Sequence, residues 1–154
     1  MNLFPAFGLG AITGMRSMMA LAFVSDHAEK EKHRNSNPAL NFLTHPQTAA
    51  ALKVMAAGEV IMDKMPFTPN RTDAAPLIGR VVLGGLVGAA ISKDKWIQGG
   101  AVGALGALLA TYTAFYIRKM LHDDRHIPNV VLGVAEDALV AKAADTLVEH
   151  FELA

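Results

Sequence analysis

Cysteine is absent from the 154 residues of the chain. Its absence excludes disulfide bonds, cysteine-ligated zinc and thiol catalysis. Charged residues are also scarce, at 18% of the sequence, against about 25% in soluble domains. The net charge is zero, so the basic excess typical of nucleic-acid-binding proteins is missing and no nucleic-acid partner is expected.

Catalytic motifs are missing as well. The sequence has no nucleophile elbow, no His-Glu-x-x-His and no phosphate-binding loop, so we expect neither enzyme activity nor a cofactor. His122 and His126 lie four residues apart with Asp123 and Asp124 between them. A metal site is one interpretation of this group, but we interpret it as a solvated turn and expect no metal.

Apolar stretches dominate what is present. Leu3–Val24, Pro76–Ser92 and Ile97–Ile117 each approach the length that crosses a hydrocarbon core of about 30 Å. Ala20-Leu21-Ala22 resembles a signal-peptide cleavage site, but no Lys or Arg precedes the apolar run, which favours a retained span. We therefore expect a single domain, residues 1–154, folded as an all-α integral membrane bundle.

Two further segments, Pro46–Pro66 and Pro128–Phe151, are helical in pattern but carry too many charges for a lipid-facing span. We predict that both are re-entrant or interfacial helices. If Pro46–Pro66 enters and returns on one side, that side holds eight of the ten loop Lys and Arg residues counted between Lys30 and Arg125. The positive-inside rule then makes that side cytoplasmic and places the N-terminus outside.

The order of these segments suggests an internal repeat. Leu3–Val24 followed by Pro46–Lys64 resembles Ile97–Ile117 followed by Pro128–Phe151, and Gly10–Gly14 resembles Gly99–Gly103. A single crossing between the copies would invert the second one, as in many transporters.

Small residues recur at helical spacing in all three apolar stretches. Such stripes let helix backbones approach closely in lipid, where hydrophobicity does not drive association. We predict helix packing at these positions, with a glycine-lined passage as the alternative. The residues are Gly10, Gly14, Ser17, Gly84, Gly88, Gly99, Gly103 and Gly106.

Several charges fall inside the predicted helices, where a charge at the bilayer centre costs about 2.5–3.5 kcal/mol. Glu136 lies in the middle of the apolar face of its helix. We expect a buried network in which Arg16 and Arg80 face Glu59 and Glu136, with Asp63 and Lys64 nearby. Structural ion pairs and a pathway for protons or ions both explain such a network. Lys64 and Arg71 are also candidates for contact with an anion or a lipid headgroup.

These motifs resemble a family of small bacterial membrane proteins known as a domain of unknown function, DUF4126. The similar segments are Gly14-Met15-Arg16-Ser17, Gly58–Pro66, Arg71 and Glu136-Asp137. The resemblance implies a helical membrane protein and no established activity; we expect it in the bacterial inner membrane.

The leading hypothesis is a small multi-pass protein, transporter- or channel-like, whose buried charges line a pathway. Its partners would be the lipid bilayer and either further copies of the chain or a larger membrane complex. The alternatives are a structural subunit of such a complex, and a membrane-embedded lipid-handling enzyme that uses Asp63, Lys64 and Arg71.

Overall fold

The computed structural model describes residues 3–30, 38–62, 73–92, 95–125 and 129–150, and the regular secondary structure of these residues is entirely helical. The all-α prediction is therefore confirmed. The helices are α1 (Phe4–Met15), α2 (Ser17–Lys30), α3 (Pro38–Leu43), α4 (Pro46–Met62), α5 (Ala74–Ala90), α6 (Trp96–Arg125) and α7 (Asn129–His150).

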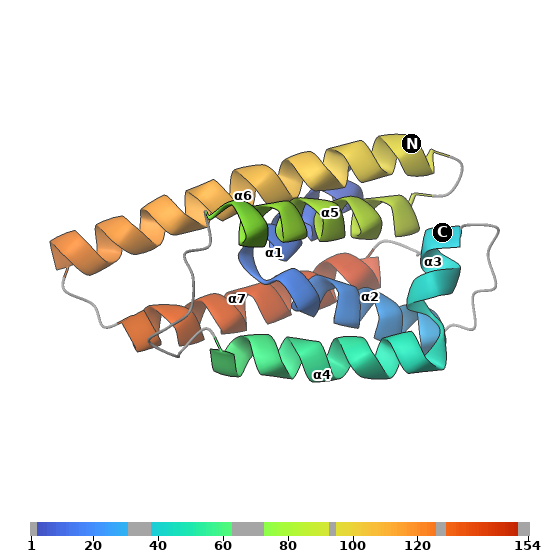
Figure 1. The fold of residues 1–154 in the computed structure, drawn as a ribbon, viewed down its shortest axis with the longest axis horizontal. Helices are drawn as coiled ribbons and strands as arrows, with labels where there is room; N and C mark the ends of the chain where they lie inside the picture. Colours follow the sequence, from blue (N-terminus) through green and yellow to red (C-terminus); the bar gives the residue numbers. More distant parts are fainter. Residues whose placement is uncertain (1–2, 31–37, 63–72, 93–94, 126–128, 151–154) are drawn as a thin grey trace.

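The first apolar stretch is not one helix. At Arg16 the backbone becomes extended (φ −137°, ψ 104°), and the chain turns back so that α1 and α2 form a helical hairpin (Figure 1). The prediction of a continuous span over Leu3–Val24 is wrong. Its halves are 12 and 14 residues long, or about 18 and 21 Å at 1.5 Å per residue.

The hairpin occupies the centre of the bundle. α1 lies against α5 and α6, α2 lies against α4, and α7 contacts both halves (Figure 1). The hairpin contributes more of the buried apolar side chains than any other described helix, including Leu9, Leu21 and Val24. Leu40 and Leu43 of α3 close the same core near α2, where the Ser25 hydroxyl donates a hydrogen bond to the Leu43 carbonyl oxygen (2.6 Å).

Backbone-to-backbone contact holds α1, α5 and α6 together. A Cβ atom on Gly10 would collide with the carbonyl oxygen of Gly103, and one on Gly88 with that of Gly99. A Cβ atom on Gly106 would lie 2.5 Å from the carbonyl oxygen of Phe7. The glycine stripes are thus used inside the chain, and they allow a helix separation that no larger residue permits.

The direction of the helices rules out the predicted inverted repeat. Gly10 lies beside Gly103 and Gly14 beside Ala107, so α1 and α6 run in the same direction, whereas inverted copies would run in opposite directions. α6 is also unbroken over 30 residues. Its counterpart Leu3–Val24 is a hairpin, and side chains of other helices cap both helix ends at its break.

Pro46–Pro66 was predicted to be re-entrant or interfacial, and the re-entrant form is wrong over the described part of the segment. α4 is one uninterrupted helix of 17 residues that runs beside α2 without turning back (Figure 1). Reversal occurs instead at Arg16, where helix ends can be capped. The eight-to-two charge count depended on the return of this segment, so it no longer supports an orientation.

Of the described helices, one meets the length and apolarity expected of a membrane span: Trp96–Leu121, within α6. Phe4–Met15 and Ala74–Ala90 are apolar but shorter. Two of the three predicted crossings therefore fall below this criterion, the first because the chain breaks at Arg16.

Gly88 and Gly58 make a matched test of the glycine contacts. Gly88→Ala places a methyl group against the Gly99 carbonyl, and overpacking of this kind costs about 1–3 kcal/mol. Nothing lies within 4 Å of a Cβ on Gly58, where alanine gains up to about 1 kcal/mol of helix propensity. Thermal unfolding of the purified protein should show a lower Tm for Gly88→Ala and an unchanged or higher Tm for Gly58→Ala. Equal shifts would contradict the packing.

Candidate functional site

The tip of the hairpin exposes two helix ends to the interior of the bundle. α1 ends at Met15 and α2 begins at Ser17. The last carbonyl groups and the first amide groups of a helix have no partner within the helix itself. Buried backbone groups without partners cost several kcal/mol in an apolar medium. The break therefore needs partners from elsewhere in the chain.

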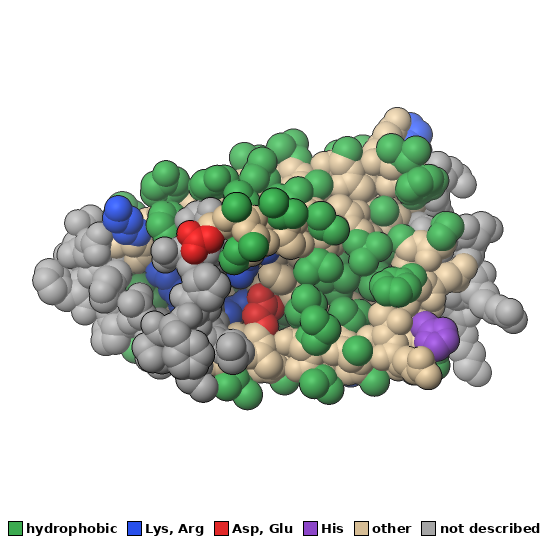
Figure 2. Space-filling view, viewed as in Figure 1, with side chains coloured by type: hydrophobic (Ala, Val, Ile, Leu, Met, Phe, Trp, Pro, Cys, Tyr) green, Lys and Arg blue, Asp and Glu red, His purple; other side chains and the backbone are tan. Residues whose placement is uncertain are grey.

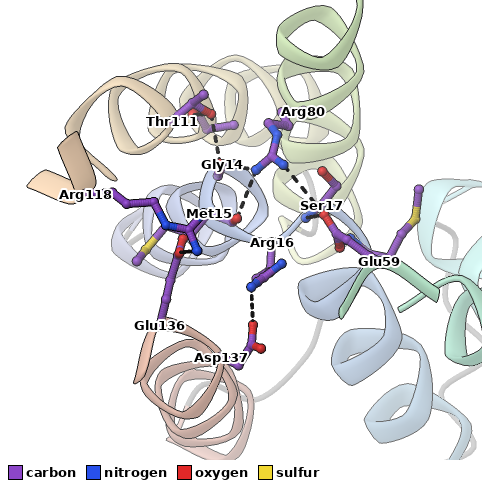
Figure 3. A network of polar contacts seen from close by, with 12 residues as sticks. Gly14, Met15, Arg16, Ser17, Glu59, Arg80, Thr111, Arg118, Glu136 and Asp137 are labelled. Atoms are coloured by element: carbon purple, nitrogen blue, oxygen red, sulfur yellow. Dashed lines mark hydrogen bonds and ion pairs between the residues drawn. The ribbon is translucent and has the colours of Figure 1, made fainter. Parts of the chain in front are cut away.

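Glu59 of α4 caps the N-terminal end of α2 (Figure 3). The backbone N–H of Ser17 donates to one carboxylate oxygen (2.8 Å) and that of Met18 to the other (2.9 Å). A negative charge at a helix N-terminus also interacts favourably with the helix dipole. Both oxygens of Glu59 are thus engaged by α2, although its side chain is still 17% exposed.

Arg80 of α5 caps the C-terminal end of α1. Its Nη1 donates to the carbonyl oxygens of Gly14 (2.6 Å) and Met15 (2.9 Å). The Thr111 hydroxyl lies 2.9 Å from the same Gly14 oxygen and 2.8 Å from the Ala107 oxygen of its own helix. Nη2 of Arg80 lies 3.7 Å from Oε1 of Glu59, so one ion pair joins the caps of both helix ends.

Arg16, the residue at the break, is the largest fully buried side chain among the described residues, at 1% exposure. Its Nη2 lies 2.5 Å from Oδ1 of Asp137 on α7. This pair ties α7 to the hairpin tip, because the extended backbone at Arg16 directs the guanidinium toward that helix (Figure 3).

A third pair lies beside it. Nη2 of Arg118 on α6 is 3.8 Å from Oε2 of Glu136 on α7. Gly133 leaves room for this guanidinium, since a Cβ there would lie 2.9 Å from Nη2. The exposures are 24% for Arg118 and 12% for Glu136, so this pair is nearer the surface than Arg16.

Together these pairs form the tip cluster: Arg16, Glu59, Arg80, Arg118, Glu136 and Asp137. Its three cations and three anions balance. The carboxylates are buried only in part, and Figure 2 shows red and blue side chains at the surface beside apolar green ones. The side chains that hold the helix ends are therefore still partly accessible from outside the bundle.

The structure brings four of the predicted residues into this cluster: Arg16, Glu59, Arg80 and Glu136. Glu136 also faces Arg118, a partner that was not predicted. Gly133 leaves room for the guanidinium of Arg118 over this helix. Asp63, Lys64 and Arg71 lie outside the described residues.

Sequence reasoning did not assign Asp137, Arg118 or Thr111 to the buried network, although Asp137 belongs to the Glu136-Asp137 motif of the resemblance. Asp137 is one position beyond Glu136, and a helical wheel places it about 100° away, toward the edge of the apolar face. Arg118 follows the apolar stretch and was interpreted as its end. The hydroxyl of Thr111 gave no signal, since a threonine in an apolar helix ordinarily bonds to its own backbone.

Comparison with known protein families assigns the chain to a family. The model of a family described as a domain of unknown function, DUF4126, matches residues 3–150. The chain belongs to the DUF4126 family. No curated protein and no solved structure matches it. Membership in DUF4126 thus confirms the resemblance and assigns no activity.

Asp137→Ala tests the most buried pair. It removes the carboxylate that faces Arg16, and removal of one partner of a buried pair costs about 3–5 kcal/mol. Asp145→Ala, at an exposed position of the same helix, should cost less than about 0.5 kcal/mol. Chemical or thermal unfolding measures both. Arg16→Met combined with Asp137→Ala should recover part of the loss, and equal small effects of the single changes would contradict burial of the pair.

Proposed function

We propose that this DUF4126 protein is a multi-pass integral membrane protein that acts as a small transporter- or channel-like protein. α6 supports the membrane location. Only 22% of its most apolar window is buried within the bundle, whereas the core helix of a soluble protein is mostly buried. The helix also begins at residue 96, far from the position of a signal sequence.

The outer faces of the other helices also support a membrane location. Large apolar side chains are exposed on every long helix outside the hairpin, a surface that suits lipid better than water. α4 and α5 have 17 residues each, about 26 Å, near the thickness of a hydrocarbon core. The exposed residues include Val54, Met55, Ile61, Ile78, Val82, Leu105, Leu109, Val131, Val134 and Leu139.

The capped break between α1 and α2 carries the proposal of transport. Interrupted helices whose ends meet charged groups inside the bundle are a common construction of transporter binding sites. Ionisable residues within membrane helices mark ion or proton pathways. The partial exposure of Glu59, Asp137 and Glu136 supports access from outside the bundle.

A structural subunit of a larger membrane complex is the second candidate, because all six charges of the tip cluster lie in ion pairs. A partner subunit or a second copy would meet the outer apolar side chains, since the glycine stripes are already covered. We propose no catalytic activity for the cluster, which holds no nucleophile beside a base.

Topology follows from the hairpin if the bundle crosses the membrane. The end of α2 and the beginning of α6 lie at one end of the bundle, and the beginning of α5 and the end of α6 lie toward the other (Figure 1). Single cysteines at Glu29 and Lys95 should react with an impermeant maleimide from one side of intact cells, and those at Asp73 and Lys119 from the other. Labelling of Glu29 and Lys95 from opposite sides would contradict the re-entrant hairpin.

Ion flux tests the function. Purified protein in liposomes that enclose a pH-sensitive dye should carry protons under an imposed pH gradient. Asp137→Asn weakens the cluster and should lower the rate by about tenfold, the effect of a change near 1.4 kcal/mol in a barrier. Asp145→Asn should leave the rate unchanged. Wild-type rates no higher than those of empty liposomes, for protons and for chloride alike, would favour the structural subunit.

A further inference from the structure

One face of α6 is exposed along most of its length. Its side chains recur at spacings of three, four or seven residues, so they lie within about 40° of Leu105 on a helix that turns about 100° per residue. The glycines that contact α1 and α5 lie on the opposite face of the helix. The exposed residues, here called the α6 stripe, are Gln98, Leu105, Leu109, Tyr112, Tyr116 and Lys119.

The length of the α6 stripe matches the thickness of a bilayer interior. The stripe begins at Gln98 and ends at Lys119, which are both polar, and Leu105 lies toward its middle. Residues 96–117 include no charged side chain. Gln98 and Lys119 are 21 positions apart, which is about 32 Å at about 1.5 Å per residue. A hydrocarbon core is about 30 Å thick.

Aromatic side chains mark both ends of this apolar length. Trp96 is 52% exposed at one end of it, and Tyr116 is 63% exposed near the other. Such side chains are enriched at membrane–water interfaces, because the ring is apolar and its N–H or O–H is polar. Lys119 follows Tyr116 by about one turn, where its ammonium group reaches the level of the headgroup phosphates. The stripe thus presents apolar, aromatic and cationic groups in the order in which a phospholipid presents its acyl chain, ester groups and phosphate.

The bulk of these side chains favours lipid over a second helix. Helices that associate in lipid approach each other through small residues, and α6 already uses its glycines against α1 and α5. Leu105, Leu109 and Tyr112 would keep another helix at a distance. A two-fold pair of stripes in one membrane would also bring both Lys119 ammonium groups to the same level, where like charges repel.

We propose that the α6 stripe is a phospholipid-binding surface, with acyl chains along Leu105 and Leu109 and headgroup phosphates at Lys119. The inference deepens the proposed function, because it fixes the depth of the bundle in the bilayer, and it rests on the membrane location given there. Trp96 then lies at one membrane interface and Tyr116 at the other.

The depth of the tip cluster follows from this placement. Thr111 lies within hydrogen-bonding distance of Gly14 (2.9 Å), so the hairpin tip is level with Thr111. That residue is 15 positions after Trp96, or about 22 Å along the helix. The tip therefore lies about 8 Å from the interface at Tyr116 and away from the bilayer centre, where a charge costs most. Arg118, two positions beyond Tyr116, lies at the level of the headgroups.

Tryptophan fluorescence measures this depth directly, because Trp96 is the single tryptophan of the chain. The protein is placed in vesicles of phosphatidylcholine and phosphatidylglycerol, with part of the phosphatidylcholine brominated either near the headgroup or near the end of the acyl chain. Bromine quenches tryptophan on contact, and vesicles without bromine give the reference intensity. The ratio of shallow to deep quenching should exceed one for Trp96. In a Trp96→Phe background it should fall below one for Leu105→Trp and exceed one again for Tyr116→Trp.

The outcomes separate this inference from the proposed function. A ratio below one for Trp96 in the wild type would overturn the inference without any variant, and a ratio above one for Leu105→Trp would do the same. Absence of quenching at Leu105→Trp, while Trp96 is quenched in the wild type, would show that a second copy or another protein covers the stripe. The membrane location would stand in each of these cases. Absence of quenching at all three positions would contradict the membrane location itself, and the inference with it.

Discussion

An interrupted helix in an apolar interior needs partners for its free backbone groups, and the rest of the bundle is arranged around that need. The amides of Ser17 and Met18 and the carbonyls of Gly14 and Met15 are satisfied by Glu59 and Arg80. These side chains come from α4 and α5, so both helices must lie against the hairpin. Arg16 then draws α7 to the same point through Asp137.

Close helix packing brings the capping side chains within hydrogen-bonding distance of the helix ends. Thr111 lies within hydrogen-bonding distance of Gly14 because a Cβ is absent from Gly14, where it would collide with Ala107. Gly84 plays the corresponding part on α5, since a Cβ there would lie 2.5 Å from that of Ala107. Small residues thus bring α1, α5 and α6 together, and the separation they allow sets the position of Arg80 one turn from Gly84.

Residue spacing predicts the glycine stripes and several of the buried charges. It does not predict the break at Arg16 or which helices pair, because these depend on contacts between distant parts of the chain. Glycine stripes and charges on apolar faces are local patterns, so Gly88, Arg80 and Glu59 could be found. The break at Arg16 has no local signal: Met15, Arg16 and Ser17 include neither proline nor glycine, and all three are compatible with a helix. Tertiary caps from residues more than 40 positions away decide it. The pairing of Glu136 with Arg118 could not be predicted for the same reason, because it depends on how α6 and α7 lie against each other.

The bundle has a part held by backbone contacts between helices and a part held by charged side chains at the hairpin tip. α1, α5 and α6 touch through backbone atoms, and such close packing has little room to deform. α4 and α7 meet the tip through charged side chains, and α2 meets it through backbone amides bound to one of those side chains. These contacts depend on the charges of the cluster. Any rearrangement at the tip would therefore be taken up by α2, α4 and α7, while the glycine-packed helices keep their places. A neutral cluster suits this arrangement, because an added charge unbalances pairs that hold the adjustable helices and leaves the glycine contacts untouched.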